Sequence, residues 1–411
     1  MPVISIFSGT FCREGLVVRE LISETGHRLI NDASVVSEAS VSCGMPENKV
    51  GRAFSAKTSV FNKFTHERER SIAHIRLVLA RMLKEDDLIV EGFSGHFIPK
   101  DVTHVLRVCL IADMSSRITT AEEESGLNKN EAVKLIREHD EDRAAWVHQL
   151  YNKNDPWNPS LYDIVIPTDK METKEIVGLI KDNMSKDALK TTEQSRNAVN
   201  DFILVSEVDV ALVREGHNVG VKAENGSVTL TINKNVLMLS RLEEELKSVA
   251  NGVQGVKSVK TKIGPDFYRT DIYRKQDFKM PSRILLVDDE REFVQTLSER
   301  LLMREMGSVI AYDGESALEL IKEDEPDVMI LDLRMPGIDG IEVLRKVKET
   351  QPAIEVIILT GHGSEADRLT CMELGAFAYL QKPVDIEELS ETIKRANEAI
   401  QQKIRAREDR P

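Results

Sequence analysis

Arg283-Ile-Leu-Leu-Val-Asp288-Asp289-Glu290, an apolar run that ends in adjacent carboxylates, begins the stretch that decides the fold. Three more apolar runs follow, and they end at Asp332, Thr360 and Lys382. Amphipathic segments of helical period lie between the runs, at 293–304, 316–323 and 341–350. Short apolar strands that alternate with such helices predict a doubly wound parallel sheet, in which ligands bind at the carboxyl ends of the strands. We therefore expect the polar residues to converge at that edge.

The residue types at these strand ends indicate phosphoryl chemistry. Three carboxylates within a few ångströms repel one another unless a cation joins them, and hard oxygen ligands favour Mg2+. Asp288 and Asp289 would hold the metal together with Asp332, which is left as the nucleophile toward a phosphoryl group. Mg2+ and Lys382 would neutralise the transferred oxygens, and Thr360 would bond one of them. The alternative is that these carboxylates only cap the following helices, but five such residues in this order favour the phosphoryl site.

The same residues carry a resemblance to a known family. The Asp288-Asp289 pair, the Asp332 that precedes Met335-Pro336-Gly337, the Thr360-Gly361 and the Lys382-Pro383 resemble the receiver domain of bacterial two-component response regulators. The resemblance covers about 282–400. It implies phosphorylation by a partner histidine kinase with Mg2+, followed by hydrolysis.

The resemblance also implies a role for each residue of the cluster. Asp332 would be the phosphoacceptor, Asp288 and Asp289 the acid pocket, and Thr360 and Lys382 the switch residues. Tyr379 would be the aromatic residue that turns inward upon phosphorylation. From its position alone, three residues before the lysine, Tyr379 is equally well a core or rim residue.

Length and charge set bounds on the whole chain. With 411 residues it is long enough for two to four domains. Its 55 basic and 69 acidic residues give a net charge of −14, which disfavours nucleic acid as a partner. Four scattered cysteines lack metal-binding spacing and indicate buried thiols in a reducing compartment. The start lacks the features of a signal peptide and no apolar run reaches membrane-spanning length, so we expect a soluble cytoplasmic protein.

The first 188 residues also predict an α/β domain. Apolar strands are expected at 3–7, 87–92, 106–112 and 162–167, with helices at 15–24, 65–84 and 173–183. The segment 126–146, followed by 154–163, resembles the cytidylate kinase-like family, whose lid helix carries Arg-x-x-Asp-x-x-Arg. Arg137, Asp140 and Arg143 match that motif. Their spacing places them on one helical face, where two guanidiniums could clamp the phosphates of ATP or CMP; the alternative is a solvated, salt-bridged face.

The first loop departs from that family. A phosphate-binding loop lies between a strand and a helix, and the family has several glycines there. Here Phe11, Arg13 and Glu14 occupy the loop, where bulk blocks close backbone approach and Glu14 adds a repelling charge. Arg13 could replace a missing cation, but Gly92-Phe93 lacks the arginine that the family has after the glycine of its third strand. We expect a degenerate kinase fold used for sensing or protein contact.

The middle of the chain, 195–265, predicts a helix at 203–214, a hairpin that turns at Asn225-Gly226, a helix at 237–253 and a strand at 256–263. This αββαβ order resembles a BON domain, a family associated with membrane surfaces or small ligands; a spacer or interaction module is the favoured interpretation. Basic and aromatic residues are interleaved through 265–282, a pattern that binds single-stranded nucleic acid or, more simply, packs as a linker. A stripe near the C-terminus could pair two chains; it comprises Ile393, Ala396, Ile400 and Ile404.

Together these features predict an α/β multidomain protein. It comprises a P-loop-kinase-like α/β domain (1–188), a small BON-like domain (195–265), a linker (266–282), a flavodoxin-like (βα)5 receiver domain (283–400) and a charged helix end (401–411). The favoured hypothesis is a response regulator phosphorylated on Asp332, with an N-terminal module that senses or binds. The alternatives are a CMP-type nucleotide kinase regulated by the receiver, with Arg13, Arg137, Asp140 and Arg143 binding nucleotide, and a non-enzymatic adaptor.

Overall fold

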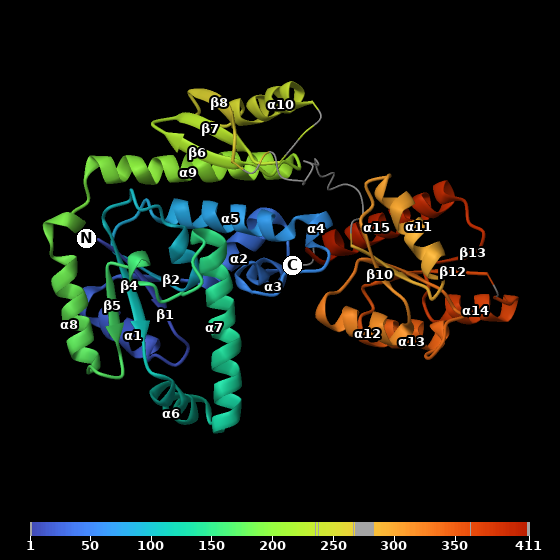
Figure 1. The fold of residues 1–411 in the computed structure, drawn as a ribbon, viewed down its shortest axis with the longest axis horizontal. Coiled ribbons are helices and arrows are strands. Elements are labelled where there is room, and N and C mark those ends of the chain that lie inside the picture. Colours follow the sequence, from blue (N-terminus) through green and yellow to red (C-terminus); the bar gives the residue numbers. More distant parts are fainter. Residues whose placement is uncertain are drawn as a thin grey trace. The chain divides into compact units, whose positions relative to one another are not determined.

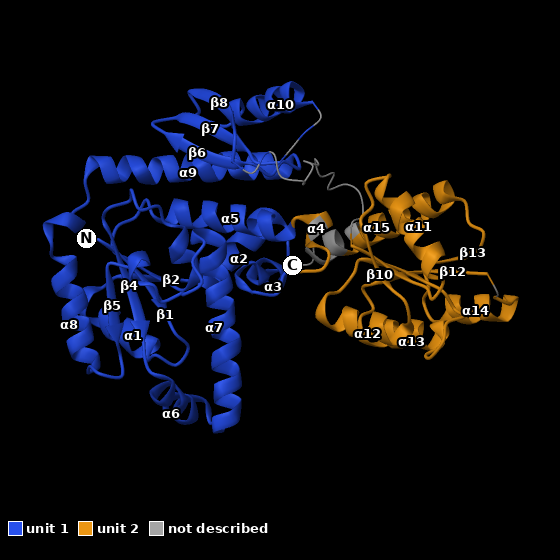
Figure 2. Ribbon diagram, in the orientation of Figure 1, with its two compact units in different colours: residues 1–58, 67–275 blue, residues 59–66, 276–411 orange. Residues whose placement is uncertain are grey.

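The computed structural model describes residues 2–234, 236, 238–265, 267, 283–361 and 363–408, so almost all of the predicted linker 266–282 lies outside the described residues. The chain divides into two compact units (Figure 2). Unit 1 consists of residues 1–58 and 67–275, and unit 2 of residues 59–66 and 276–411. No helix of the described ranges is long and apolar enough to cross a membrane.

Unit 1 contains a five-stranded parallel sheet of order β2-β3-β1-β4-β5 (Figure 1). Its strands are β1 (Val3–Ser8), β2 (Arg28–Asn31), β3 (Leu88–Glu91), β4 (Val105–Ile111) and β5 (Ile164–Pro167). Every residue of β1 is buried, because helices cover both faces of a sheet of this kind. Four of these strands were predicted. The edge strand β2 was missed because its four residues are half exposed and too few to show a pattern.

Helices cover both faces of this sheet, and alternate strand residues face different helices. Val3 packs with α2, α5 and α9, whereas Ile4 and Ile6 pack with α1 and α8. The helices of the unit are α1 (Glu14–Thr25), α2 (Asp32–Cys43), α3 (Glu47–Gly51), α5 (Glu67–Met82), α6 (Met114–Ser125), α7 (Lys129–Tyr151), α8 (Thr173–Met184), α9 (Glu193–Arg214) and α10 (Leu239–Asn251), with 3-10 turns η1 (Arg52–Phe54), η2 (Phe93–Phe97), η3 (Pro159–Leu161) and η4 (Asp187–Leu189).

Unit 1 also contains a small mixed sheet of order β6-β7-β8. Strands β6 (Gly220–Glu224) and β7 (Ser227–Ile232) are antiparallel through the predicted Asn225-Gly226 turn, and β8 (Ser258–Ile263) runs parallel to β7. The helix before this sheet, α9, begins ten residues earlier than predicted, at Glu193 rather than residue 203. Its first half packs in the core of the five-stranded sheet through Phe202, and its second half packs on the small sheet through Val208. The described elements follow the αββαβ order.

Unit 2 contains a second parallel sheet, of order β10-β9-β11-β12-β13 (Figure 1). Its strands are β9 (Ile284–Val287), β10 (Ser308–Ala311), β11 (Val328–Leu331), β12 (Glu355–Thr360) and β13 (Ala378–Gln381). Its helices are α4 (Asn62–Thr65), α11 (Arg291–Leu302), α12 (Gly314–Glu323), α13 (Gly340–Thr350), α14 (Glu365–Glu373) and α15 (Ile386–Glu408). The strand order reverses between β9 and β11, the place where open α/β sheets bind ligands.

The expected C-terminal pairing stripe is largely an internal feature of unit 2. Ile393, Ala396 and Ile400 on α15, which contacts β11, β12 and α11, are buried in the core on one face of the sheet. Burial of one such isoleucine stabilises the fold by about 1.5–3 kcal/mol, so these side chains are not available to a second chain. The side chain of Ile404 lies outside the described residues. The stripe as drawn from the sequence was therefore the wrong surface for self-association.

Candidate functional site

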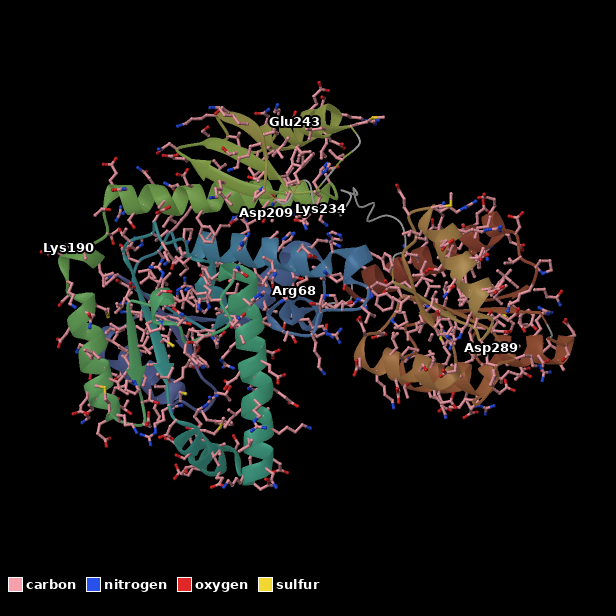
Figure 3. All side chains as sticks on the ribbon, viewed as in Figure 1. Arg68, Lys190, Asp209, Lys234, Glu243 and Asp289 are labelled. Carbon is pink, nitrogen blue, oxygen red and sulfur yellow. The ribbon has the colours of Figure 1, made fainter. Side chains whose placement is uncertain are left out.

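Two neighbouring strands of unit 2 end level with each other, and each is followed by a buried carboxylate. Val287 of β9 pairs with Leu331 of β11, so Asp288 and Asp332 follow at the same edge. The backbone N–H of Asp332 donates to the carbonyl of Val287 at 2.9 Å, which fixes this register. One oxygen each of Asp288, Asp289 and Asp332 lies within 4.8 Å of the others (Asp289 is labelled in Figure 3). The predicted convergence of these three side chains is present.

Lys382 supplies positive charge to this carboxylate cluster. It follows β13, and its Nζ lies 2.7 Å from Asp288 Oδ2, 3.0 Å from Glu290 Oε1 and 3.3 Å from Asp332 Oδ2. Burial raises the pKa of Asp288, and the ammonium of Lys382 opposes that effect. Burial by itself lowers the pKa of Lys382, but its bonds to Asp288 and Glu290 outweigh burial and raise it. The lysine is therefore held charged among the carboxylates.

The two oxygens of Asp332 have different partners. Oδ1 accepts from the backbone N–H of Leu333 at 2.7 Å, and Oδ2 faces Lys382. The backbone of Asp332 is held in turn by the start of α13, where a Cβ on Gly340 would lie 2.2 Å from the Asp332 carbonyl oxygen. Only glycine fits at this close backbone approach. Asp332 thus has one oxygen held by the chain and one directed at the cation.

Besides Lys382, the predicted switch residues are Thr360, at the end of β12, and Tyr379, in β13. Thr360 is fully buried, and its carbonyl accepts from the backbone N–H of Lys382 at 2.9 Å. The hydroxyl of Tyr379 is enclosed and has no hydrogen-bond partner within the described part of the chain. A Cβ built on Gly363 would meet both Tyr379 Oη and Thr360 Cγ2, at 1.6 and 3.0 Å. Gly363 therefore provides the space that the tyrosine hydroxyl occupies beside Thr360.

The donor set suits a divalent cation. Three carboxylates, two buried and one half-buried, offer the hard oxygen ligands and the negative charge that Mg2+ prefers over nitrogen or sulfur donors. The Asp288, Asp289 and Asp332 side chains fit a Mg2+ site.

Comparison with known proteins agrees with this geometry. A family model described as the response regulator receiver domain matches residues 284–394. Residues 284–394 are a response regulator receiver domain. Similar proteins include Response regulator MprA of Mycolicibacterium vanbaalenii, 40% identical over 27% of this chain and 48% of its own length. Transcriptional regulatory protein CpxR of Escherichia coli is 44% identical over 26% of this chain and 46% of its own length. The chain thus spans about half the length of these curated relatives.

Solved structures of receiver domains are also similar to part of the chain. A CheY-like receiver domain from Methanospirillum hungatei JF-1 is 27% identical, covers 29% of this chain and 97% of that one, and has a TM-score of 0.29. A receiver domain from Clostridium thermocellum is 36% identical, covers 29% and 94% of the two chains, and has a TM-score of 0.28.

Outside the receiver, the loop between β1 and α1 is the second predicted site. Phe11 and Arg13 adopt left-handed φ values of 62° and 56°, a conformation that glycine adopts without strain. The backbone carbonyls of the loop are occupied, since Arg143 Nε donates to Ser8 O at 2.7 Å and Arg117 Nε donates to Thr10 O at 2.8 Å. The loop is therefore fastened through its carbonyls to two helices.

The four predicted nucleotide-binding residues divide into two pairs. Asp140 and Arg143 lie beside the loop, where Asp140 accepts two 2.8 Å bonds from the guanidinium of Arg117. Arg13 and Arg137 are exposed. Arg117 was not predicted as a site residue; it is 6% exposed and reaches the loop from α6, outside the lid motif. A lone arginine in a polar helix carries no pattern that would single it out.

Acidic side chains line the same edge of the unit 1 sheet. Asp32, at the start of α2, accepts from the backbone N–H groups of Phe93 and Ser94 at 2.7 and 2.9 Å. Burial raises the pKa of Glu14 to about 7, a bond from Ser8 opposes this, and Glu91 adds to it. Acidic side chains, one bonded to backbone amides and one shifted by burial toward its neutral form, therefore lie where a phosphate would need amides and cations. A second family model, described as the cytidylate kinase-like family, matches residues 3–170. These residues form a cytidylate kinase-like domain.

The Arg117–Asp140 pair is expected to be a stability element of unit 1. Asp140→Ala leaves the buried guanidinium without its bidentate partner and should lower the free energy of unfolding by about 2–3 kcal/mol, since the pair is only partly exposed. The control Arg137→Ala removes an exposed charge from the same helix and should change it by less than about 0.5 kcal/mol. Urea unfolding followed by tryptophan fluorescence measures both, because Trp146 and Trp157 lie in unit 1. Equal effects of the two substitutions would refute this role.

Glu14 is expected to make the stability of unit 1 depend on pH. Its pKa is raised from 4.5 to about 7, so between these values the folded chain holds a proton that the unfolded chain has released. The contribution is most favourable below pH 4.5 and is lost as pH rises to about 7. The same urea assay, run at about pH 5 and about pH 7.5, measures this loss of unfolding free energy. Glu14→Gln should reduce the loss, because the amide does not titrate. An unchanged pH dependence would show that Glu14 titrates normally.

Proposed function

We propose that this chain is a two-component response regulator whose receiver takes a phosphoryl group from a partner histidine kinase onto Asp332. The observation that supports this best is the meeting of three carboxylates with Lys382 at the strand ends. Phosphoryl transfer requires positioning and charge neutralisation, and this cluster supplies both. Hydrolysis of the acyl phosphate would return the receiver to its starting state.

The roles of the side chains follow from their contacts. Asp332 Oδ2 is the attacking atom, because Oδ1 is held by the backbone of Leu333. Asp288 and Asp289 would hold Mg2+ together with Asp332, and the ion would neutralise charge on the phosphoryl oxygens. Lys382, whose Nζ lies 3.3 Å from Oδ2, binds a phosphoryl oxygen. Thr360 binds another phosphoryl oxygen and moves toward it, and Tyr379 follows as the switch aromatic.

The phosphorylated receiver is proposed to act on a surface of its own as well as on the rest of the chain. Movement at Thr360 and Tyr379 changes β13 and the neighbouring helix α14. Leu369 and Met372 are exposed on α14. These side chains, rather than the buried stripe of α15, provide the apolar surface for self-association of two receivers.

For the N-terminal half we propose sensing or protein interaction in place of nucleotide phosphorylation. The supporting contacts are those of Arg117 and Arg143, which bond to loop carbonyls and to Asp140 rather than lying open to a phosphate. The proposed divisions are 1–188 for this module, 195–265 for a BON-like spacer or interaction module, 266–282 for the linker, 283–400 for the receiver and 401–411 for the helix end.

A CMP-type kinase regulated by the receiver is the second candidate. It is favoured by the match of residues 3–170 to the cytidylate kinase-like family and by the position of Asp140 and Arg143 beside the loop. The crowded loop and its acidic surroundings weigh against it.

Asp332 is expected to be the single phosphoacceptor. Incubation of the full chain with acetyl phosphate and Mg2+ should label the wild type and leave Asp332→Asn unlabelled. Asp289→Ala should slow labelling because it removes a metal ligand. The control is Asp339→Asn, which replaces an exposed acid seven residues away that caps α13 and should be labelled like the wild type. Acid-labile label on Asp332→Asn at the wild-type level would exclude the assignment.

Nucleotide binding separates the two candidates for the N-terminal half. Because Phe11, Arg13 and Glu14 replace a glycine-rich cradle, ATP should bind the full chain more weakly than about 1 mM in calorimetry. A micromolar dissociation constant together with turnover of CMP would establish the kinase in its place.

A further inference from the structure

A short segment of the N-terminal half belongs to the receiver's compact unit. Residues 59–66, which include α4, lie in the sequence between η1 and α5 of unit 1, yet they are part of unit 2 (Figure 2). The chain therefore passes between the units at 58/59, at 66/67 and at 275/276. Residues 59–66 are called the docked segment below.

Asp324 of the receiver holds the start of the docked segment. Its Oδ2 accepts from Ser59 Oγ at 2.7 Å and from the backbone N–H of Val60 at 2.8 Å. Its Oδ1 accepts from Arg283 Nη2 at 3.3 Å. Both partners of this ion pair are buried, with 4% of Asp324 and 3% of Arg283 exposed. A buried carboxylate that accepts from a guanidinium and from two further donors favours one arrangement of these groups over others.

Aromatic side chains complete the contact. Phe61 is fully buried, and the guanidinium of Arg283 lies 5.3 Å from its ring centroid, within cation–π range. Phe64 packs directly on the backbone of Gly307, where a Cβ would lie 2.2 Å from the ring. The side chain of Val60, between these contacts, is 46% exposed. The segment thus turns its aromatic residues to the receiver and leaves Val60 outside.

These receiver residues lie at the edge opposite the phosphorylation site. Arg283 precedes β9, Gly307 precedes β10, and Asp324 follows α12 ahead of β11. All three are therefore at the amino ends of parallel strands, whereas Asp288 and Asp332 are at the carboxyl ends. The docking surface leaves the acid cluster accessible.

On the unit 1 side, the residues that flank the docked segment are bonded to helices α7 and α5. Asp142 of α7 accepts from the backbone N–H of Ala56 at 2.7 Å, and the next residue, Arg143, holds Ser8 of the β1–α1 loop. Arg68 in the first turn of α5 donates to Ala53 O at 3.2 Å and to Thr58 Oγ1 at 2.9 Å (Arg68 is labelled in Figure 3). Both flanks are thus bonded within unit 1. The partner of one flank, Asp142, is the sequence neighbour of Arg143.

We propose that Arg283, Gly307 and Asp324 form an intramolecular docking surface for residues 59–66, and that this segment carries the state of the receiver to the Arg143 loop. The route runs from the receiver edge through the docked segment to Ala56, Asp142 and Arg143. This route connects the two units in addition to the predicted linker 266–282. Its regulatory use rests on the proposed phosphorylation of Asp332, whereas the docking contact does not.

Hydrogen exchange on the full chain tests the docking contact. In the wild type, peptides that cover 59–66 should exchange slowly. Phe61→Ala should raise their exchange, and that of 283–287, by about tenfold or more, because it removes the buried anchor. Val60→Ala, which changes only an exposed side chain beside it, should match the wild type. Wild-type fluorescence of the tryptophans and wild-type labelling by acetyl phosphate would show that both units of Phe61→Ala remain folded. Fast exchange of 59–66 in the wild type, or no change in Phe61→Ala, would overturn the proposal.

The same measurement with beryllofluoride and Mg2+, which stand in for the phosphoryl group, tests the coupling. Exchange in 139–143 should change on addition in the wild type and should not change in Phe61→Ala. A response around Asp332 without any response in 139–143 would refute the coupling and leave the receiver function intact. Absence of any response around Asp332 would instead contradict the proposed phosphorylation site.

Discussion

The structure of the receiver depends on one electrostatic constraint: three carboxylates within 4.8 Å of one another require a cation. Lys382 meets part of that requirement at 2.7 Å from Asp288, and Mg2+ suits the rest. The lysine can reach the cluster only if β13 joins the sheet beyond β12, and Asp332 can approach Asp288 only if β11 lies beside β9. The strand order is therefore tied to the chemistry, and Gly340 is required because α13 starts against the backbone of Asp332.

Unit 1 has the same type of sheet and uses its carboxyl edge differently. There the cations are the arginines Arg117 and Arg143, and their guanidiniums donate hydrogen bonds to loop carbonyls and to Asp140. The carboxylates at that edge are either bonded to backbone amides, as Asp32 is, or shifted toward neutrality by burial, as Glu14 is. We propose that one of the two parallel sheets in this chain carries a reactive site and that the other uses its carboxyl edge structurally, in line with the rule that a fold alone does not determine function.

Much of the site could be predicted because its residues stand at strand ends, where parallel geometry brings them together. The convergence of Asp288, Asp289 and Asp332 follows from that rule, as does the hairpin at Asn225-Gly226. What could not be predicted depends on contacts distant in sequence. Arg117 approaches the loop from another helix, and the α15 stripe is covered by its own domain. Residues 59–66 belong to a unit whose other residues lie more than two hundred positions later in the chain. Short strands such as β2 carry too few residues for a periodic signal.

We propose that Asp332 accepts a phosphoryl group and that the β1–α1 loop does not bind the phosphates of a nucleotide. A crystal structure of the full chain, grown with Mg2+, beryllofluoride and ATP together, tests both halves of that claim at once. We expect beryllofluoride on Asp332 Oδ2, Mg2+ held by Asp288 and Asp289, and no nucleotide at residues 9–14. ATP phosphates bound by the backbone of that loop, or Asp332 without beryllofluoride beside it, would contradict the proposed division of roles.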